Sequence, residues 1–224
     1  METIIKIDQL TKIYKKQHSV FKALDKVSFQ LETGEVLGIM GESGCGKTTL
    51  LNILAGMETA SSGSVWLKQG LTMHMVFQNP VASFNPRMTI GRSLSEGLIN
   101  KQVPLAQREK ILQELLQQCG LDNSYLTAYP QELSGGQCQR AALVRALTCS
   151  PQVLLCDEMT SSLDTITKKQ ILELMKALCK QRKMSVIIVD HDTALLAELC
   201  SRLLVMRDGC LIDEGTVEEI LPHS

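Results

Sequence analysis

Residues 41–48 carry a chemically specific pattern, in which glycines at positions 41 and 46 are followed directly by a lysine and a threonine. Glycine lets the backbone curl so that successive N–H groups point at phosphate oxygens. The lysine of such a loop reaches the β- and γ-phosphates, and the hydroxyl after it can ligate Mg²⁺. An apolar run precedes the pattern and a helical one follows it, so we predict an ATP-binding loop formed by Gly41, Glu42, Ser43, Gly44, Cys45, Gly46, Lys47, Thr48 and Thr49.

Two adjacent carboxylates, Asp157 and Glu158, follow the apolar run at residues 153–156. If that run is a strand of a parallel sheet, its carboxyl end lies at the ligand crevice beside the phosphate loop. Asp157 is then expected to hold Mg²⁺, and Glu158 to orient and deprotonate the attacking water. The pair alone could equally cap a strand in solvent. The phosphate loop earlier in the chain favours the catalytic interpretation.

The elements that must position these residues alternate between strands and helices. Apolar stretches predict strands at 4–7, 27–31, 36–40, 63–77, 153–156, 186–189 and 203–206. Periodic apolar positions predict helices at 47–54, 107–118, 137–147, 171–178 and 193–199. This alternation predicts an α/β fold with a parallel sheet covered on both faces. Residues from about 79 to 150 lack strand character and are interpreted as a helical insertion.

Composition bounds the class of protein. The chain has 224 residues, 44% hydrophobic and 21% charged, as in an ordinary globular protein. A net charge of −1 and an aromatic content of 4% argue against a nucleic-acid partner. No apolar run approaches the ~18 residues that cross a bilayer, and the N-terminus lacks the pattern of a secretory signal. Eight cysteines without a C-x-x-C pair are interpreted as buried apolar residues of a cytoplasmic protein.

The segment Leu133-Ser-Gly-Gly-Gln137 separates the possible classes of phosphate-loop protein. A serine and two glycines before a helix form a second anion-binding device. Here the chain resembles the ATP-binding-cassette (ABC) ATPases, whose signature is this pentapeptide. The resemblance implies that the signature closes over ATP held by another subunit. The residues that would bind ATP in trans are Ser134, Gly135, Gly136 and Gln137.

Other residues that match the family's motifs occur in the expected order along the chain. The resemblance assigns Tyr14 to adenine stacking, and Gln78 to catalysis, Mg²⁺ and the loop that links the nucleotide site to a partner subunit. It assigns His191 to the γ-phosphate and Asp164, in the segment 161–164, to a dimer contact. Each has a structural alternative: a surface aromatic, a loop amide, a strand-end histidine and a helix N-cap. The resemblance implies one nucleotide-binding domain over 1–224, with a P-loop NTPase parallel sheet core, an antiparallel β subdomain and a helical subdomain.

Residues 75–91, with the sequence MVFQNPVASFNPRMTIG, are similar to the peptide and nickel importer branch of the family. This implies an ATPase that powers uptake of nickel, a metal–chelator complex or a di- or oligopeptide. The implied partners are a second ATPase subunit, identical or homologous, two integral membrane permease subunits and, indirectly, an extracytoplasmic solute-binding protein. The expected location is the cytoplasmic face of the inner membrane, to which the chain is bound peripherally.

Two alternatives stay open from the sequence: an ABC-like subunit of a phosphonate-degrading complex, and the ATPase of a lipoprotein or drug exporter. The chain also departs from the pattern of its branch. The stretch 63–78 is short, and Met159 stands where many relatives have proline. Met73-His74-Met75 could suggest a soft-metal site, but we favour a core strand, with the methionines on one face and the histidine on the other.

Overall fold

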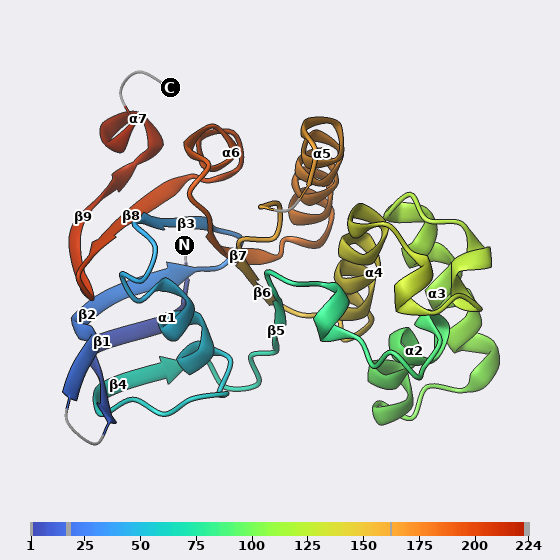
Figure 1. Ribbon diagram of the computed structural model, residues 1–224, viewed down its shortest axis with the longest axis horizontal. Coiled ribbons are helices and arrows are strands. Elements are labelled where there is room, and N and C mark those ends of the chain that lie inside the picture. Colours follow the sequence, from blue (N-terminus) through green and yellow to red (C-terminus); the bar gives the residue numbers. More distant parts are fainter. Residues whose placement is uncertain (1, 17–18, 162, 222–224) are drawn as a thin grey trace.

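The protein is described here by a computed structural model covering residues 2–16, 19–161 and 163–221. Its centre is a six-stranded sheet in the order β5-β6-β7-β3-β8-β9, parallel except for the last strand (Figure 1). The bounds of these strands are β3 Val36–Gly41, β5 Met73–Val76, β6 Val153–Asp157, β7 Ser185–Val189, β8 Arg202–Arg207 and β9 Cys210–Thr216. Parallel pairing brings the carboxyl ends of β3, β6 and β7 to one edge of the sheet.

Both faces of this sheet are buried, and successive residues of a strand serve different cores. In β6, Leu154 and Cys156 belong to one hydrophobic cluster, whereas Val153 and Leu155 belong to the other. Helices α4 to α6 pack on the first face. Helix α1 (Lys47–Leu54) packs on the second. This two-sided burial explains why the central strands are continuous apolar runs and confirms the predicted α/β class.

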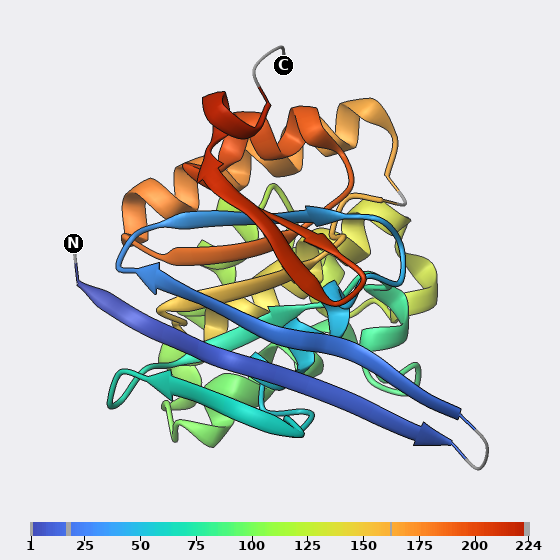
Figure 2. The same cartoon turned by 90° about the vertical axis from the view of Figure 1, so that its left-hand side faces the viewer.

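An antiparallel sheet of three strands, ordered β2-β1-β4, closes the second core. Its strands are β1 Thr3–Lys16, β2 Ser19–Glu32 and β4 Ser62–Leu67. Figure 2 shows the long β1–β2 pair crossing the molecule with α1 behind it. Buried residues of β1 and β2, such as Ile5, Ile7 and Phe29, share a cluster with Leu50 of α1. The antiparallel sheet therefore holds the helix that begins at the phosphate loop.

Helices without strands occupy residues 81–148, at the opposite end of the molecule from β1, β2 and β4 (Figure 1). The α-helices here are α2 Ile90–Asn100, α3 Leu105–Gln118 and α4 Gly135–Thr148, with short 3₁₀ turns at Val81–Ser83 (η1), Asn123–Leu126 (η2) and Pro130–Glu132 (η3). Helix α2 was not predicted from the sequence. Thr89 marks its start, because its side chain accepts a hydrogen bond from the amide of Arg92. Buried Ile90, Leu94 and Leu98 recur every four residues and give α2 a regular apolar face, so a helical pattern was present in the sequence and was overlooked.

The stretch 63–77, predicted as strand, forms two strands, β4 and β5, that belong to different sheets. The elements after β6 agree with the sequence closely. Helices α5 (Thr165–Arg182) and α6 (Thr193–Leu199) include the predicted spans. Asp208 and Gly209 form the hairpin turn with positive φ at both positions, and Thr216 opens α7 (Val217–Ile220) through a capping box. Met73 and Met75 pack against the second core, as a core strand requires.

All eight cysteines are free thiols, buried or half-buried, which confirms their interpretation as apolar filling. Burial raises the pKa of Cys119 and Cys200 to about 12 and that of Cys179 to about 11, as an apolar environment requires. Among the described helices, none combines the length and the apolar character needed for a membrane span.

Candidate functional site

The phosphate loop joins β3 to α1 with a backbone that requires glycine. Gly46 has φ 106°, and a Cβ there would lie 2.2 Å from the carbonyl oxygen of Ala23. A Cβ on Gly41 would lie 2.2 Å from the carbonyl oxygen of Met206. Residues 42–44 between them are exposed. The loop therefore presents its backbone to solvent just before the positive end of the α1 dipole, the arrangement that receives phosphate oxygens.

Lys47 is the cation of this loop, and the loop's own carbonyls hold it. Its side chain is only 6% exposed, and Nζ lies 2.7 Å from the oxygen of Gly41 and 2.8 Å from that of Glu42. Cys45 is buried, with Sγ 3.7 Å from the same ammonium. A buried cation satisfied by neutral dipoles keeps its full charge available to an anion at the loop. Cys45 fills space, as expected.

Thr48 and Asp157 meet where β6 ends beside the start of α1. The Thr48 hydroxyl donates to Oδ1 of Asp157 at 3.3 Å. Burial raises the pKa of Asp157, and the Thr48 hydrogen bond and the charge of Lys47 partly offset this. Two oxygens bound at right angles to one Mg²⁺ lie about 3 Å apart, because each bond is about 2.0–2.1 Å long. The hydroxyl and carboxylate oxygens therefore fit a magnesium ion in both chemistry and spacing.

Glu158 lies between two polar groups that the sequence analysis had assigned to the same site. Its Oε2 accepts a hydrogen bond from Nε2 of Gln78 at 2.6 Å, and its Oε1 lies 4.0 Å from Nδ1 of His191. Glu158 has φ 42°, a left-handed conformation, and its amide donates to the carbonyl of Val189. The strained turn aims the carboxylate away from β6 toward the two partners. A carboxylate held this way can orient a water molecule and accept its proton.

Asp190 was not singled out in the sequence, although it sets the position of His191. Its side chain is 1% exposed, and Oδ1 accepts hydrogen bonds from the amides of His191 at 2.8 Å and Asp192 at 3.0 Å. Thr160, in the turn after Glu158, donates to its other oxygen at 3.3 Å. Asp190 therefore ties the turn after β6 to the turn after β7. The sequence signal was a carboxylate directly between an apolar strand and a histidine.

Tyr14 lies near the first turn of α1, within reach of Thr49. Its hydroxyl donates to Oε2 of Glu58 at 2.6 Å, and Nζ of Lys12 lies 5.0 Å from the ring centre. Burial is the largest cause of its raised pKa, followed by Glu58, and Thr49 of α1 lowers it by a hydrogen bond. The ring is thus fixed near the first turn of α1 by Glu58, a residue that the sequence analysis did not select. Its adenine-stacking role stays a prediction.

The signature segment (Ser134–Gln137) forms the start of α4 in a capping box. The Ser134 hydroxyl accepts from the amide of Gln137, and the Gln137 side chain accepts from the amide of Ser134. Ser134 and Gly135 are exposed, so one more anion-binding helix start faces solvent. Asp164 caps α5 by accepting hydrogen bonds from the amides of Ile166 and Thr167. It therefore acts as a helix N-cap, which was the structural alternative to a dimer contact. Ser162, within the predicted dimer-contact segment, lies outside the described residues.

The structure gathers part of the predicted set and leaves the rest apart. Lys47, Thr48, Asp157, Glu158, Gln78 and His191 come together at the carboxyl edge of the sheet. Among the described residues, no hydrogen bond or ion pair joins the signature segment to the phosphate loop, and the two lie at separate places along the molecule (Figure 1). The arrangement can bind a nucleotide phosphate and activate water at one place, and present anion-binding amides at the other.

Fold and site together define a phosphate-loop ATPase of the cassette type. The family model described as "ABC transporter" matches residues 24–161, more than half of the chain, so the chain belongs to the ABC transporter family. It resembles a solved dimeric ATP-binding cassette in a post-hydrolysis state bound to ADP and Pi, with a TM-score of 0.87 and 29% identity over 96% of this chain and 99% of that one.

Two curated relatives carry transport descriptions. The oligopeptide transport ATP-binding protein OppF of Haemophilus influenzae is 39% identical over 89% of this chain and 65% of its own. The nickel import system ATP-binding protein NikE of Staphylococcus aureus is 35% identical over 97% of this chain and 92% of its own. The chain thus spans slightly less than two thirds of the length of the oligopeptide relative. These relatives agree with the importer branch to which the sequence is similar.

Proposed function

We propose that this chain is the ATP-hydrolysing subunit of an ABC importer and works as half of an ATP-closed dimer. The observation that carries the proposal is the separation of two anion-binding devices within one chain. The phosphate loop lies beside Asp157 and Glu158, whereas the signature segment opens to solvent elsewhere. A second ATPase subunit, identical or homologous, would cover the nucleotide with its own signature segment. The related cassette solved as a dimer supports this arrangement.

In this proposal each gathered residue has a separate task. Lys47 and the backbone of residues 41–49 bind the phosphates of ATP, and Tyr14 stacks on adenine. Thr48, Asp157 and Gln78 hold Mg²⁺, which neutralises charge on the phosphates when bound. Glu158 orients and deprotonates the attacking water, and His191 contacts the γ-phosphate. Ser134, Gly135, Gly136 and Gln137 serve the nucleotide of the partner, and Asp164 lies at the dimer contact.

The chain would form a single nucleotide-binding domain over 1–224, in which residues 79–150 are the helical subdomain. A groove of about 420 Å³ separates this subdomain from the end of β5, and its lining includes Met57, Phe77 and Glu96. Phe77 directly precedes Gln78, whose amide reaches Glu158. We propose this groove as the contact for one of two integral membrane permease subunits, because a subunit bound there would lie close to Gln78 and the catalytic carboxylate of Glu158.

The proposed cargo follows the relatives: a di- or oligopeptide, nickel or a metal–chelator complex, delivered by an extracytoplasmic solute-binding protein. The chain would be bound peripherally at the cytoplasmic face of the membrane. Nothing in the strand Met73–Met75 favours nickel as a ligand of this chain itself. Burial, together with the charges of Lys101 and Arg145, lowers the pKa of His74. The same two positive charges would oppose the binding of a metal cation there.

Capture of the tagged chain from gently solubilised membranes tests the proposal. We expect a second ATPase and integral membrane subunits to copurify, with ATP turnover that rises when a solute-binding protein loaded with its cargo is added. Recovery with soluble enzymes alone would instead support the phosphonate-complex alternative. Turnover with membrane subunits of an exporter, indifferent to any solute-binding protein, would support the exporter alternative.

A further inference from the structure

The side chain of Gln137 is held at both of its polar ends. Its Oε1 accepts a hydrogen bond from the amide of Ser134 at 2.8 Å. Its Nε2 donates to the hydroxyl of Tyr125 at 2.7 Å. A side-chain amide anchored through both its acceptor and its donor has one usable orientation, because a flip would break both bonds. Gln137 is therefore fixed between the signature segment and a residue outside it.

Ser134 depends on Gln137 in turn. The Ser134 hydroxyl accepts from the amide of Gln137 at 3.3 Å, so the two residues hold each other in the capping box. Ser134 and Gly135 are exposed and carry the groups that would meet a phosphate. A hollow of about 210 Å³ at this place is lined by Tyr125, Ser134, Gly136 and Gln137, among others. Tyr125 thus borders the surface that would receive the partner's nucleotide.

Tyr125 is itself anchored to the start of α2. It belongs to η2, where the amide of Ala128 donates to the Tyr125 carbonyl at 3.2 Å and the amide of Ile90 donates to the Ala128 carbonyl at 2.8 Å. A Cβ on Gly91 would lie 2.6 Å from the carbonyl oxygen of Leu126, so the two backbones touch. Helix α2 begins at Ile90, after the segment that follows Gln78. The signature segment is therefore connected to that segment through Tyr125.

We infer that Tyr125 is a positioning residue for ATP hydrolysis in trans: its hydroxyl orients Gln137 and thereby holds Ser134 and the first amides of α4 ready for the partner's nucleotide. This inference rests on the proposed function and adds to it a residue outside the signature. The ring of Tyr125 packs against the core of the helical end, so the ring and the hydroxyl have separable roles. The hydroxyl can be removed while the packing stays.

Tyr125→Phe tests the inference in the assembly captured from membranes. One neutral hydrogen bond is lost, so we expect kcat for ATP to fall about 2- to 10-fold. The KM for ATP and the binding of a fluorescent ATP analogue to the open subunit should stay unchanged, because the phosphate loop is untouched. Tyr129→Phe is the matched control. It removes the hydroxyl of an exposed tyrosine four residues away, and we expect it to leave kcat as it is.

A double-mutant cycle separates positioning from loss of folding. In a Gln137→Ala background the Tyr125 hydroxyl has no amide to orient, so adding Tyr125→Phe should lower kcat no further. Independent, multiplying losses would overturn the inference, as would an unchanged kcat in Tyr125→Phe alone. A fall in kcat that follows a lowered unfolding temperature would also overturn it. Copurification tests the importer proposal separately, since the kinetics can be measured in whichever assembly the chain joins.

Discussion

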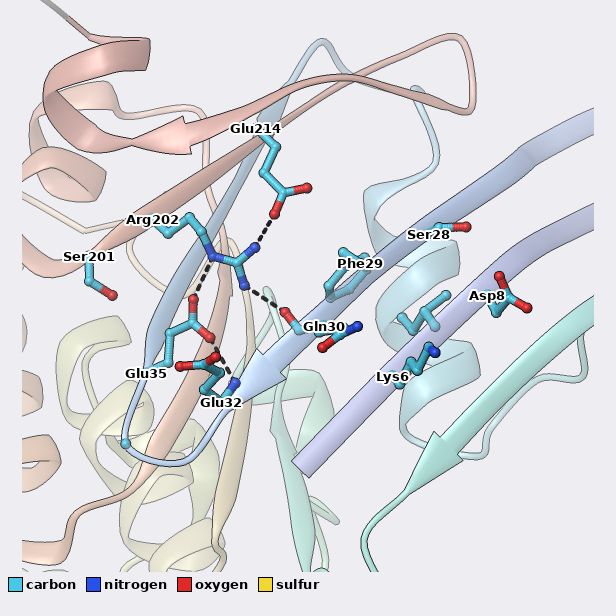
Figure 3. Close-up of a pocket in the computed structure, with 12 residues that line it drawn as sticks. Lys6, Asp8, Ser28, Phe29, Gln30, Glu32, Glu35, Ser201, Arg202 and Glu214 are labelled. Atoms are coloured by element: carbon cyan, nitrogen blue, oxygen red, sulfur yellow. Dashed lines mark hydrogen bonds and ion pairs between the residues drawn. The ribbon is translucent and has the colours of Figure 1, made fainter. Parts of the chain in front are cut away.

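Polar clusters lie at both edges of the central sheet, and they differ in how their charges are matched. At the amino edge, Arg202 begins β8 and is surrounded by acceptors: its Nε lies 2.7 Å from Glu35, one terminal nitrogen contacts Glu214, and the other donates to the carbonyl of Gln30 at 2.6 Å (Figure 3). Burial alone would lower the pKa of Arg202, but the hydrogen bonds and charges of Glu35 and Glu214 outweigh it, and the pKa rises.

At the carboxyl edge the buried charges are less completely paired with opposite charges and hydrogen-bond partners. Asp157 is only 5% exposed, but the hydrogen bond that it accepts from the Thr48 hydroxyl is long, at 3.3 Å. Its pKa is raised, so the interactions within the chain do not offset the cost of burying its charge. The amino-edge cluster borders a hollow of about 780 Å³, which is larger than the hollow of about 450 Å³ lined by Gln78 and Asp157 at the carboxyl edge. Hollow size therefore does not identify the site. The site is identified instead by a buried charged group that is only partly paired within the chain and can still bind a ligand.

Glu158→Gln should have the largest effect at the carboxyl edge. The amide keeps the shape and the contact with Gln78 but accepts no proton, so ATP turnover should fall by about 10²–10⁴ while ATP binding persists. The variant should accumulate as a closed dimer with ATP, seen by size-exclusion chromatography. Turnover at the level of the unmodified chain would remove Glu158 from the role of base.

His191→Ala should have the next largest effect. The side chain is 63% exposed and contributes little to packing, so the unfolding temperature should stay unchanged. Loss of one charge-assisted contact to phosphate should lower kcat about 10- to 100-fold. Steady-state ATP hydrolysis and thermal unfolding, measured side by side, check both statements. A large loss of stability would instead assign His191 to structure.

Arg202→Met should show the reverse pattern. Removing the guanidinium leaves Glu35 and Glu214 without their cation, so the free energy of unfolding should fall by about 1–3 kcal/mol, less than for a fully buried pair. ATP turnover at a temperature where the variant is folded should be unchanged. Lys110→Met, which removes a charge from an exposed position of α3, serves as the control and should change neither quantity. Lost turnover in folded Arg202→Met would break the comparison.

Asp157→Asn should change the free energy of unfolding by less than Arg202→Met does, and in the opposite direction. Because burial raises the native pKa of Asp157, the native state binds its proton more readily than the unfolded state does. The favourable contribution is present below the unfolded pKa and is lost as the pH rises through the raised native pKa. The nucleotide-free variant should therefore be slightly more stable than the unmodified chain near neutral pH, with the difference disappearing in acid. Denaturant unfolding at several pH values measures this. A less stable variant at neutral pH would show that Asp157 is structural.

Much of the fold could be predicted because local pattern and tertiary role agree. The strand at Val153–Asp157 is buried on both faces and is apolar up to its final residue, Asp157. The helix at Lys47–Leu54 begins directly after Gly46. Helix α2 was missed although its signals are local: Thr89 caps its start, and Ile90, Leu94 and Leu98 form an apolar stripe that packs against α4. Glu58 and Asp190 escaped because their partners, Tyr14 and Thr160, lie 44 and 30 residues away along the chain.

The sequence by itself determined the phosphate loop, the acidic pair and the signature segment, since each depends on residue types at short spacing. Only the tertiary structure decided which of these residues meet. Parallel pairing of β3, β6 and β7 brings Thr48, Asp157 and Glu158 to one edge. The packing of η2 against α2 brings Tyr125 to Gln137. Contacts between distant segments are set by burial of the elements between them, which no short stretch of sequence records.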